Sequence, residues 1–173
     1  VEQNVIATHN VLESMREKGV GYLAFTSTST VYGEAQVMPT PEDYGPLLPI
    51  SIYAASKLAS EALISAHCGT FGMEADLFRF ANCVGPNGTH GVIVDFIKKL
   101  RADPARLEIL GDGTQTKSYF HVSDCVSGML WAVENGPGGV QAYNIGSEDA
   151  IVVTTIADIV TSVMGLEGVE YTY

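Results

Sequence analysis

The chain has 173 residues, enough for one domain with a sizeable core, and its composition of 46% hydrophobic and 17% charged residues is ordinary for a globular protein. Its formal net charge is -11, with only 9 lysines and arginines. This excess of negative charge repels nucleic-acid phosphates and anionic lipids, and no basic stripe offsets it locally. The charge therefore argues against a nucleic-acid-binding protein and against a membrane-surface protein.

The cysteines and histidines give no sign of a disulfide framework or a metal site. The chain has three cysteines, an odd number with no C-x-x-C pair, at Cys68, Cys83 and Cys125. Its 4 histidines are not spaced as metal ligands, either with one another or with the cysteines. No apolar run approaches the roughly 18 residues of a membrane span, and no signal peptide opens the chain. We expect a reducing, cytoplasmic compartment, no metal and no membrane contact.

The first half of the chain predicts two helices and two strands. Apolar residues recur at helical spacing before Gly19, and a later apolar run suits a strand that is covered on both faces of a parallel sheet. The expected elements are a helix up to Lys18, a strand at 22–26, a proline-rich loop at 33–49, a helix capped by Ser51 and running to about Cys68, and a strand at 76–82.

The second half continues the alternation of helix and strand. The expected elements are a helix from Val92 that Asp103-Pro104 ends, strands at 106–110 and 119–122, a helix capped by Ser123, a strand at 141–145, a helix capped by Thr154, and a strand at 169–173. Such alternation along the whole chain is typical of a doubly wound α/β fold with a parallel sheet.

Tyr53 and Lys57 form the most informative spacing. Four residues on a helix place the phenol and the ammonium side by side. A tyrosine that acts as a base near pH 7 needs its pKa lowered from about 10, a change of roughly 4 kcal/mol, and a neighbouring lysine cation supplies part of it. Taken alone, this spacing is common by chance and is better explained by a helix that begins with an amphipathic tyrosine and exposes a lysine one turn later.

A run of hydroxyl side chains, Thr26 to Thr30, follows the first expected strand. Ligands gather at the carboxyl ends of strands in a parallel sheet, and a hydroxyl there can bond a hydroxyl of a substrate. The alternative is a turn whose Ser and Thr side chains satisfy local backbone groups. The run therefore predicts a ligand site only in combination with other signals.

Four motifs occur in one order along the chain. They are Thr28 to Gly33, Tyr53-x-x-x-Lys57, Arg79 to Asn82 followed by Gly85-Pro86, and Gly111-Asp112-Gly113 leading to Tyr119 to Asp124. In this order and spacing, they resemble the extended short-chain dehydrogenases/reductases that act on nucleotide sugars, the NAD-dependent epimerase/dehydratase family. Within that family, the chain is most similar to the UDP-glucose 4-epimerase group, and the resemblance covers essentially all residues.

This resemblance implies a role for individual positions. The implied catalytic residues are Thr28, Tyr53 and Lys57. The implied NAD-binding residues are Asn4, Thr26, Tyr53, Lys57 and Phe80. The implied substrate-binding residues are Thr28, Asn82, Val92, Leu110 and Lys117. Lys117 stands where many relatives have a phosphate-binding arginine, and its ammonium lacks the bidentate fork of a guanidinium.

The glycine-rich turn that holds the NAD pyrophosphate in this family is absent from the sequence. The resemblance implies that this turn, and further strands and helices, precede Val1, and that the substrate lobe continues past Tyr173. We therefore expect an incomplete Rossmann-like portion at 1–90 and 121–146, and part of a small substrate-binding lobe at 91–120 and 147–173. The piece alone is expected to be inactive.

The implied function is NAD-dependent epimerisation at C4 of a nucleotide sugar, with a UDP-hexose favoured, through a 4-keto intermediate, in a homodimer. Dehydratases and decarboxylases of the same family usually carry acidic residues directly after the strand-end threonine, where this chain has Ser29 and Thr30. Epimerisation is therefore preferred over a 4,6-dehydratase or a decarboxylase. A non-catalytic NAD-binding interaction protein is the alternative from another class, because fold alone does not fix function.

Overall fold

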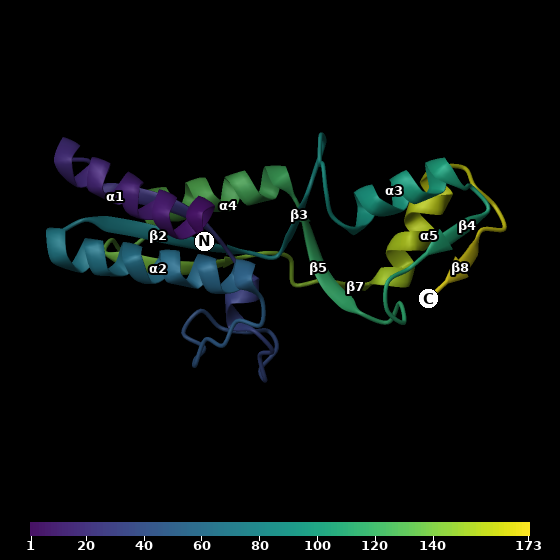
Figure 1. Cartoon of the computed structure of the whole chain (residues 1–173), viewed down its shortest axis with the longest axis horizontal. Coiled ribbons are helices and arrows are strands. Elements are labelled where there is room, and N and C mark those ends of the chain that lie inside the picture. The colour runs from purple at the N-terminus through teal and green to yellow at the C-terminus, as the bar shows by residue number, and fades with distance from the viewer. The chain divides into compact units, whose positions relative to one another are not determined.

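A computed structural model describes all residues, 1–173, and it divides into two compact units. Unit 1 comprises residues 1–81 and 123–146, and unit 2 comprises residues 82–122 and 147–173. Residues 82–90 thus lie in unit 2, whereas the sequence analysis grouped them with the Rossmann-like portion. Unit 1 contains one sheet and unit 2 contains two, and each unit has its own buried cluster of apolar side chains (Figure 1).

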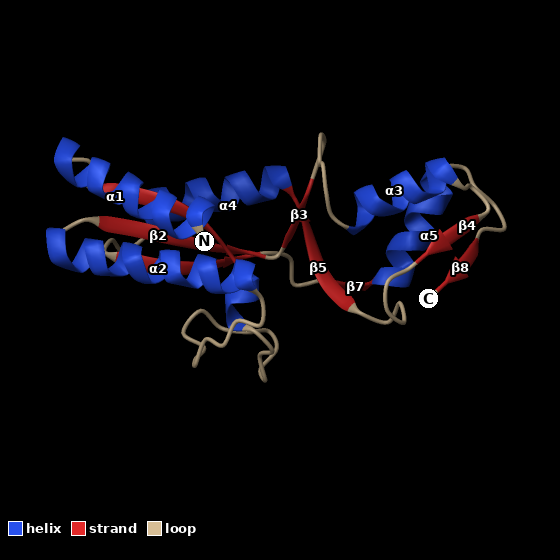
Figure 2. Ribbon diagram, in the orientation of Figure 1, coloured by secondary structure: helices blue, strands red, loops and turns tan.

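Unit 1 is built on a three-stranded parallel sheet in the order β1-β2-β6, with helices on either side of the strands (Figure 2). Its elements are η1 (Glu2–Ile6), α1 (Ala7–Lys18), β1 (Tyr22–Thr28), η2 (Ser29–Tyr32), α2 (Ile52–Phe71), β2 (Glu74–Phe80), most of α4 (Val122–Asn135) and β6 (Val140–Ile145). Helix α2 connects two adjacent parallel strands, β1 and β2. The doubly wound α/β fold expected from the sequence is confirmed.

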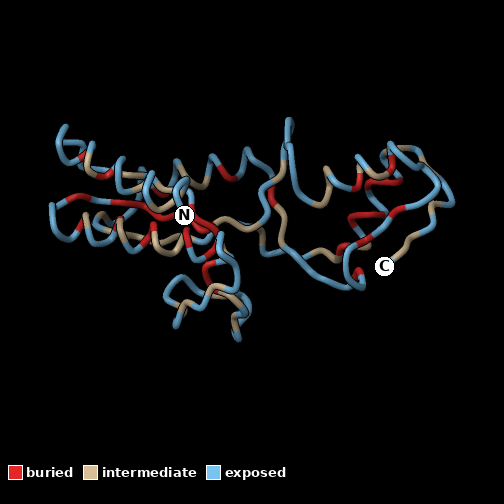
Figure 3. The backbone as a smooth tube through the Cα atoms, in the orientation of Figure 1, coloured by how far each residue is buried: buried red, intermediate tan, exposed pale blue.

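The core of unit 1 lies between the sheet and helices α1 and α2. Strand β2 is central, and all its residues between Glu74 and Phe80 are buried (Figure 3). The buried cluster consists of Leu12, Met15, Ile64, Cys68, Met73, Ala75 and Leu77. Because alternate residues of a strand face opposite sides, Ala75 and Leu77 meet the two helices while Phe78 stacks on Tyr143 on the other face.

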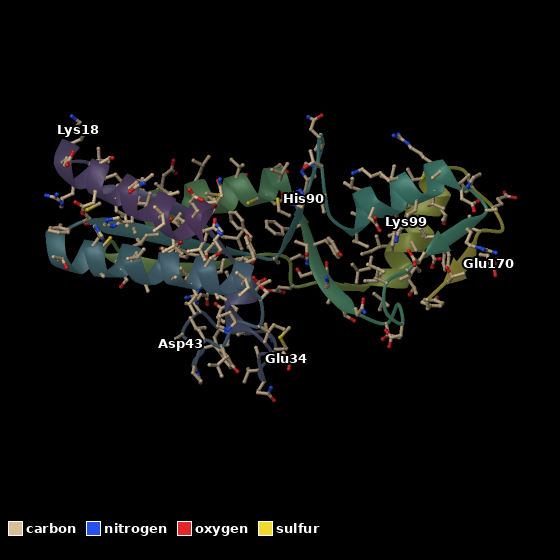
Figure 4. The ribbon with its side chains drawn as sticks, viewed as in Figure 1. Lys18, Glu34, Asp43, His90, Lys99 and Glu170 are labelled. Carbon is tan, nitrogen blue, oxygen red and sulfur yellow. The ribbon has the colours of Figure 1, made fainter.

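A long loop joins η2 to α2, as the four prolines between residues 33 and 49 predicted. Gly33 starts it with a positive φ of 66°, and a Cβ there would collide with the Leu48 carbonyl oxygen at 2.0 Å. Only glycine therefore lets the two ends of the loop approach so closely. Glu34 and Asp43 lie on this loop with exposed side chains (Figure 4).

Unit 2 packs two helices against short strands. Its elements are β3 (Asn82–Val84), α3 (Val92–Ala102), β4 (Arg106–Glu108), β5 (Thr116–His121), β7 (Ala150–Val152), α5 (Val153–Val163) and β8 (Glu170–Thr172). Strands β3 and β5 are parallel, β5 and β7 are antiparallel, and β4 pairs with β8 in parallel. Phe96 and Leu100 of α3 meet Ile156 and Val160 of α5 in its core.

Three boundary predictions are wrong. Strand β2 ends at Phe80, and Asn82 belongs to β3, because it pairs with Tyr119 of β5. Helix α4 starts at Val122, directly after β5, so Ser123 is its second residue and does not precede it. Helix α5 starts at Val153, and Thr154 is its second residue, with a backbone N–H that donates to the Gly113 carbonyl at 3.3 Å.

No helix is both long enough and apolar enough to cross a bilayer. No group of three or more His, Cys, Asp or Glu side chains is placed to hold a metal ion. The three cysteines are free thiols, of which Cys68 and Cys125 are buried and Cys83 is exposed.

The cap of α2 gives the first prediction. The Ser51 hydroxyl accepts a hydrogen bond from the Ala54 N–H at 3.1 Å. Ser51→Ala in the full-length protein is expected to lower the free energy of unfolding by about 1 kcal/mol, because one backbone donor loses its partner. Urea unfolding measures the change. Ser65→Ala, at an exposed position within the same helix, is the matched control, and an equal loss in both variants would contradict the role of the cap.

Candidate active site on helix α2

Helix α2 brings Tyr53 and Lys57 to the same side of its first turns. Ser51 has an extended backbone and its hydroxyl caps the helix, so the helix begins at Ile52. Tyr53 is then the second helical residue, and Lys57 follows four residues later, one turn along. The cap thus fixes where along the helix the phenol and the ammonium stand.

The Lys57 ammonium is held at the carboxyl end of strand β1. Its Nζ donates to the Thr26 carbonyl at 2.7 Å and lies 4.7 Å from the centre of the Phe25 ring. An ammonium has three N–H donors, so one backbone bond leaves donors for other groups. The strand and the ring therefore fix the position of the cation without using all its hydrogen-bonding capacity.

Tyr53 is not sealed in the core, because 53% of it is exposed. Its backbone carbonyl accepts a hydrogen bond from the Ser56 hydroxyl at 2.7 Å, and Ser56 in turn accepts one from the Asn4 side-chain amide at 2.7 Å. Asn4 lies on η1, and it thus contacts the first turns of α2 through Ser56. The phenol remains open to a ligand while its backbone is tied down.

Burial lowers the pKa of the Lys57 ammonium, and the negative charge of Glu61 partly opposes that effect. Burial acts in this direction because it removes water from the charged form. Lys57 stands one helical turn from the exposed Tyr53 phenol, whose hydroxyl can donate or accept a hydrogen bond.

Thr28 and Phe80 are neighbours at the ends of their strands, where the register of β1 and β2 pairs them. Thr28 is 8% exposed, and its hydroxyl accepts a hydrogen bond from the Thr30 N–H at 3.3 Å and lies 3.0 Å from the Thr30 hydroxyl. The hydroxyl run therefore does form the local turn that the sequence offered as an alternative. The Thr26 carbonyl accepts a hydrogen bond from Lys57. The carboxyl end of β1 and β2 therefore brings together Thr26, Thr28, Phe80 and Lys57.

The donor set on this edge fits the ribose of a dinucleotide. An ammonium with spare donors and an exposed phenol, which can donate or accept, suit vicinal hydroxyls. Tyr53 and Lys57 are the residues of unit 1 that could hold such a ribose, with Phe80 and Thr26 beside them.

The residues expected to bind substrate lie in unit 2. The Asn82 side-chain amide donates to the Ser118 carbonyl at 2.9 Å, so part of its capacity is used within the unit. Val92 is the first residue of α3 and packs against the core, whereas Leu110, two residues after the end of β4, is 71% exposed. Lys117 is exposed on β5, opposite Ile151 of β7.

From the sequence, Glu61 has no predicted role, Ser27 is only a member of the hydroxyl run, and Arg79 is only part of a motif. The structure joins the three in a buried network next to Lys57. A signal was available, since Glu61 follows Lys57 by four residues, as Lys57 follows Tyr53. An acidic side chain is almost never fully buried unless it is paired.

The sequence model of the NAD dependent epimerase/dehydratase family matches residues 1–146, which include Thr28, Tyr53, Lys57 and Asn82. The chain belongs to this family. NAD is the cofactor by which the family is described, and members of similar structure have been solved with NAD bound.

Curated family members are about 30% identical to the chain over the aligned residues. It is 32% identical to a putative UDP-glucose 4-epimerase of Methanocaldococcus jannaschii over 95% of the chain and 54% of that protein. It is 29% identical to a UDP-glucose 4-epimerase of Corynebacterium glutamicum over 94% of the chain and 54% of that protein. The chain thus spans about half the length of the relatives it matches.

Solved structures of the family superpose on the chain. A UDP-galactose 4-epimerase is 45% identical, with a TM-score of 0.88 over 97% of the chain and 55% of that protein. A dTDP-glucose 4,6-dehydratase from Streptomyces venezuelae is 28% identical, with a TM-score of 0.87 over 99% of the chain and 53% of that protein. Epimerases and dehydratases therefore share this fold.

The burial of Lys57 predicts a measurable titration. Its ammonium should lose its proton below the ordinary lysine pKa of about 10.4, because burial lowers the pKa. NMR of the protein with ¹³C-methylated lysines measures the midpoint, and the signal that disappears in Lys57→Arg assigns the residue. A midpoint at or above the ordinary value would show that the ammonium is not desolvated.

Proposed function

We propose that the full protein epimerises a nucleotide sugar at C4 with NAD, and that Tyr53 is its acid and base. One observation carries the proposal: the Lys57 ammonium is fixed at the carboxyl end of β1, four residues along α2 from a half-exposed phenol. The identity with curated 4-epimerases and with a solved UDP-galactose 4-epimerase supports this reaction within the family.

Tyr53 accepts the proton of the sugar 4-hydroxyl as its phenolate and returns it at the end of the reaction. Lys57 stabilises the phenolate by its positive charge. Thr28, at the end of β1, orients the sugar through its hydroxyl. Because the phenolate is restored when the proton returns, the residues of this chain end the cycle unchanged.

A bound NAD supplies reversible acceptance of hydride from C4, which allows the hydride to return to the opposite face of a 4-keto sugar. Lys57 and Tyr53 hold the nicotinamide ribose, with Asn4, Thr26 and Phe80 nearby. In unit 1, the fixed ammonium at the Thr26 carbonyl supports this assignment, since its remaining N–H donors suit ribose hydroxyls.

The substrate in this proposal is a UDP-hexose. Asn82 and Lys117 contact the diphosphate, Val92 packs beside the substrate, and Leu110 lies along the base. The exposure of Leu110 and of Lys117 supports a role in binding rather than in the core of unit 2. Lys117 adds positive charge to a chain of net charge -11, and an anionic diphosphate needs such a donor.

A 4,6-dehydratase is the second candidate, because the dehydratase from Streptomyces venezuelae superposes about as well as the epimerases. Elimination of water from the sugar needs further proton transfers at neighbouring carbons. The two residues after Thr28 are Ser29 and Thr30, neither of which has a carboxylate. Their hydroxyls are weak acids and bases, and so epimerisation is the better fit.

The protein is further proposed to be cytoplasmic and to form a homodimer through α1 and α2. Ile6 and Val11 are each 50% exposed, and Phe71 at the end of α2 is 49% exposed. Exposed apolar side chains on two adjacent helices are typical of a surface that pairs with another helical surface.

Tyr53→Phe tests the catalytic proposal in the full-length protein with NAD and UDP-galactose. Turnover at saturating NAD is expected to fall by at least about 10²-fold, because the proton has no acceptor. Product analysis by NMR measures the interconversion of the two hexoses. Tyr173→Phe, at an exposed position, is the matched control. Near-normal epimerisation by Tyr53→Phe would refute the role, and a 4-keto-6-deoxy product would favour the dehydratase.

Lys117→Ala tests the diphosphate contact. The KM for UDP-galactose is expected to rise about tenfold with little change in kcat, since a lost charged hydrogen bond weakens ground-state and transition-state binding alike. Lys98→Ala removes an exposed charge from α3 and serves as the control. Equal KM values in the two variants would exclude Lys117 from the substrate site.

A further inference from the structure

Glu61 is a buried carboxylate held on two sides. It is 4% exposed and accepts hydrogen bonds from the Ser27 hydroxyl and from Arg79, whose Nη2 lies 2.7 Å from Oε2. The Arg79 Nε lies 3.2 Å from Oε1 and 3.3 Å from Oε2, and Arg79 is 7% exposed. A buried charge pair of this kind is tolerated only when its remaining hydrogen-bonding capacity is satisfied.

The contacts of Glu61 continue those of Lys57 along the same helix face. Tyr53, Lys57 and Glu61 stand four residues apart on α2 and so form one stripe. Lys57 binds the carbonyl of Thr26, and Glu61 binds the hydroxyl of the next residue, Ser27. Two adjacent positions of β1 are therefore attached to two successive turns of α2, which fixes how far the helix slides along the strand.

Arg79 also connects this network to the loop between η2 and α2 and, through Tyr32, to strand β6. Its Nη1 donates to the Tyr32 hydroxyl at 2.9 Å and to the Glu42 carbonyl at 3.0 Å. The Tyr32 hydroxyl donates to the Asn144 side chain at 2.8 Å. Glu61 is thus the point at which α2 joins a network that spans β1, β2, β6 and the loop before the helix.

We propose that Glu61 is a positioning residue for the Tyr53–Lys57 pair: by binding Ser27 and Arg79 together, it sets the register of α2 on β1 and hence the place of the phenol and the ammonium. This inference rests on the proposed function, since it assigns a role in the same reaction. Glu61 acts through Lys57 and contacts no substrate atom itself.

The charge of Glu61 adds a second effect. The groups that face Lys57 are Tyr53 and Glu61 on its own helix and the Phe25 ring and Thr26 carbonyl on β1. Arg79 on β2 binds the Glu61 carboxylate. Among these, the Glu61 carboxylate favours the protonated ammonium and opposes the effect of burial on the pKa of Lys57. Without that carboxylate, Lys57 loses its proton at a lower pH.

Glu61→Gln in the full-length protein with NAD and UDP-galactose tests the proposal, because glutamine keeps the shape and an acceptor oxygen but removes the charge. We expect kcat to fall by about tenfold to a hundredfold with a smaller change in KM, as displaced reacting groups imply. The alkaline limb of kcat against pH should move to lower pH. Glu61→Asp, which restores the charge with a shorter side chain, should return that limb toward its original position.

Ile64→Val is the control for stability alone. Ile64 is fully buried in the same helix and belongs to the apolar cluster, without a hydrogen bond to the ion pair. This variant should keep the pH profile and the kcat of the parent. A Glu61→Gln enzyme with parental kcat and an unmoved alkaline limb would overturn the proposal, as would an Ile64→Val enzyme with the same losses as Glu61→Gln.

Should Glu61→Gln fail to fold, Ser27→Ala carries the test. It removes only the hydroxyl that ties the carboxylate to β1 and leaves the Arg79 pair in place. A severalfold fall in kcat is expected, and parental kcat would overturn the proposal. Where Glu61→Gln folds, the Lys57 titration read by NMR in this variant and in the parent is independent of the substrate, and a lower midpoint is expected in the variant. If the parent epimerises no sugar, the proposed function fails while this readout still reports on Glu61.

Discussion

The buried ion pair between Glu61 and Arg79 is the interaction on which unit 1 depends. Desolvation of two charges is costly, and their attraction offsets the cost only with good geometry and further hydrogen bonds. Here Ser27, Tyr32 and the Glu42 carbonyl supply those bonds. The pair therefore forces helix, strands and loop into one arrangement, because an alternative packing would leave a charge buried without a partner.

The same constraint explains why the edge of the sheet can carry chemistry. Side chains that act on a ligand have to remain exposed, and exposed groups contribute little to holding themselves in place. Tyr53 is half exposed, yet its helix is fixed by Ser51 at the start and by Glu61 two turns further. The Ser51 cap and the buried Glu61–Arg79 pair thus hold α2 in place, while the Tyr53 phenol stays accessible to a ligand.

Periodicity and turn residues predicted most of the fold, because helix and strand patterns are local properties of the chain. The parallel sheet, the proline-rich loop and the cap at Ser51 followed from them. The failures at Ser123, Thr154 and Asn82 have a nonlocal cause: the neighbouring strands β5, β7 and β3 determine where the elements begin and end. Spacing brought Tyr53 and Lys57 together, but the pairing of Glu61 with Arg79 arises only when α2 packs on β2, and no local pattern contains it.

Unit 1 is interrupted in sequence by unit 2, and this has a consequence during synthesis. Strands β1 and β2 leave the ribosome first, whereas β6 follows only after residues 82–122 and α4 have been made. Until Val140 to Ile145 emerge, one side of β2 has no partner strand, and Tyr32 has no Asn144 to bind. The nascent chain thus carries an open strand edge, the kind of surface that chaperones shield, for as long as the intervening segment takes to translate.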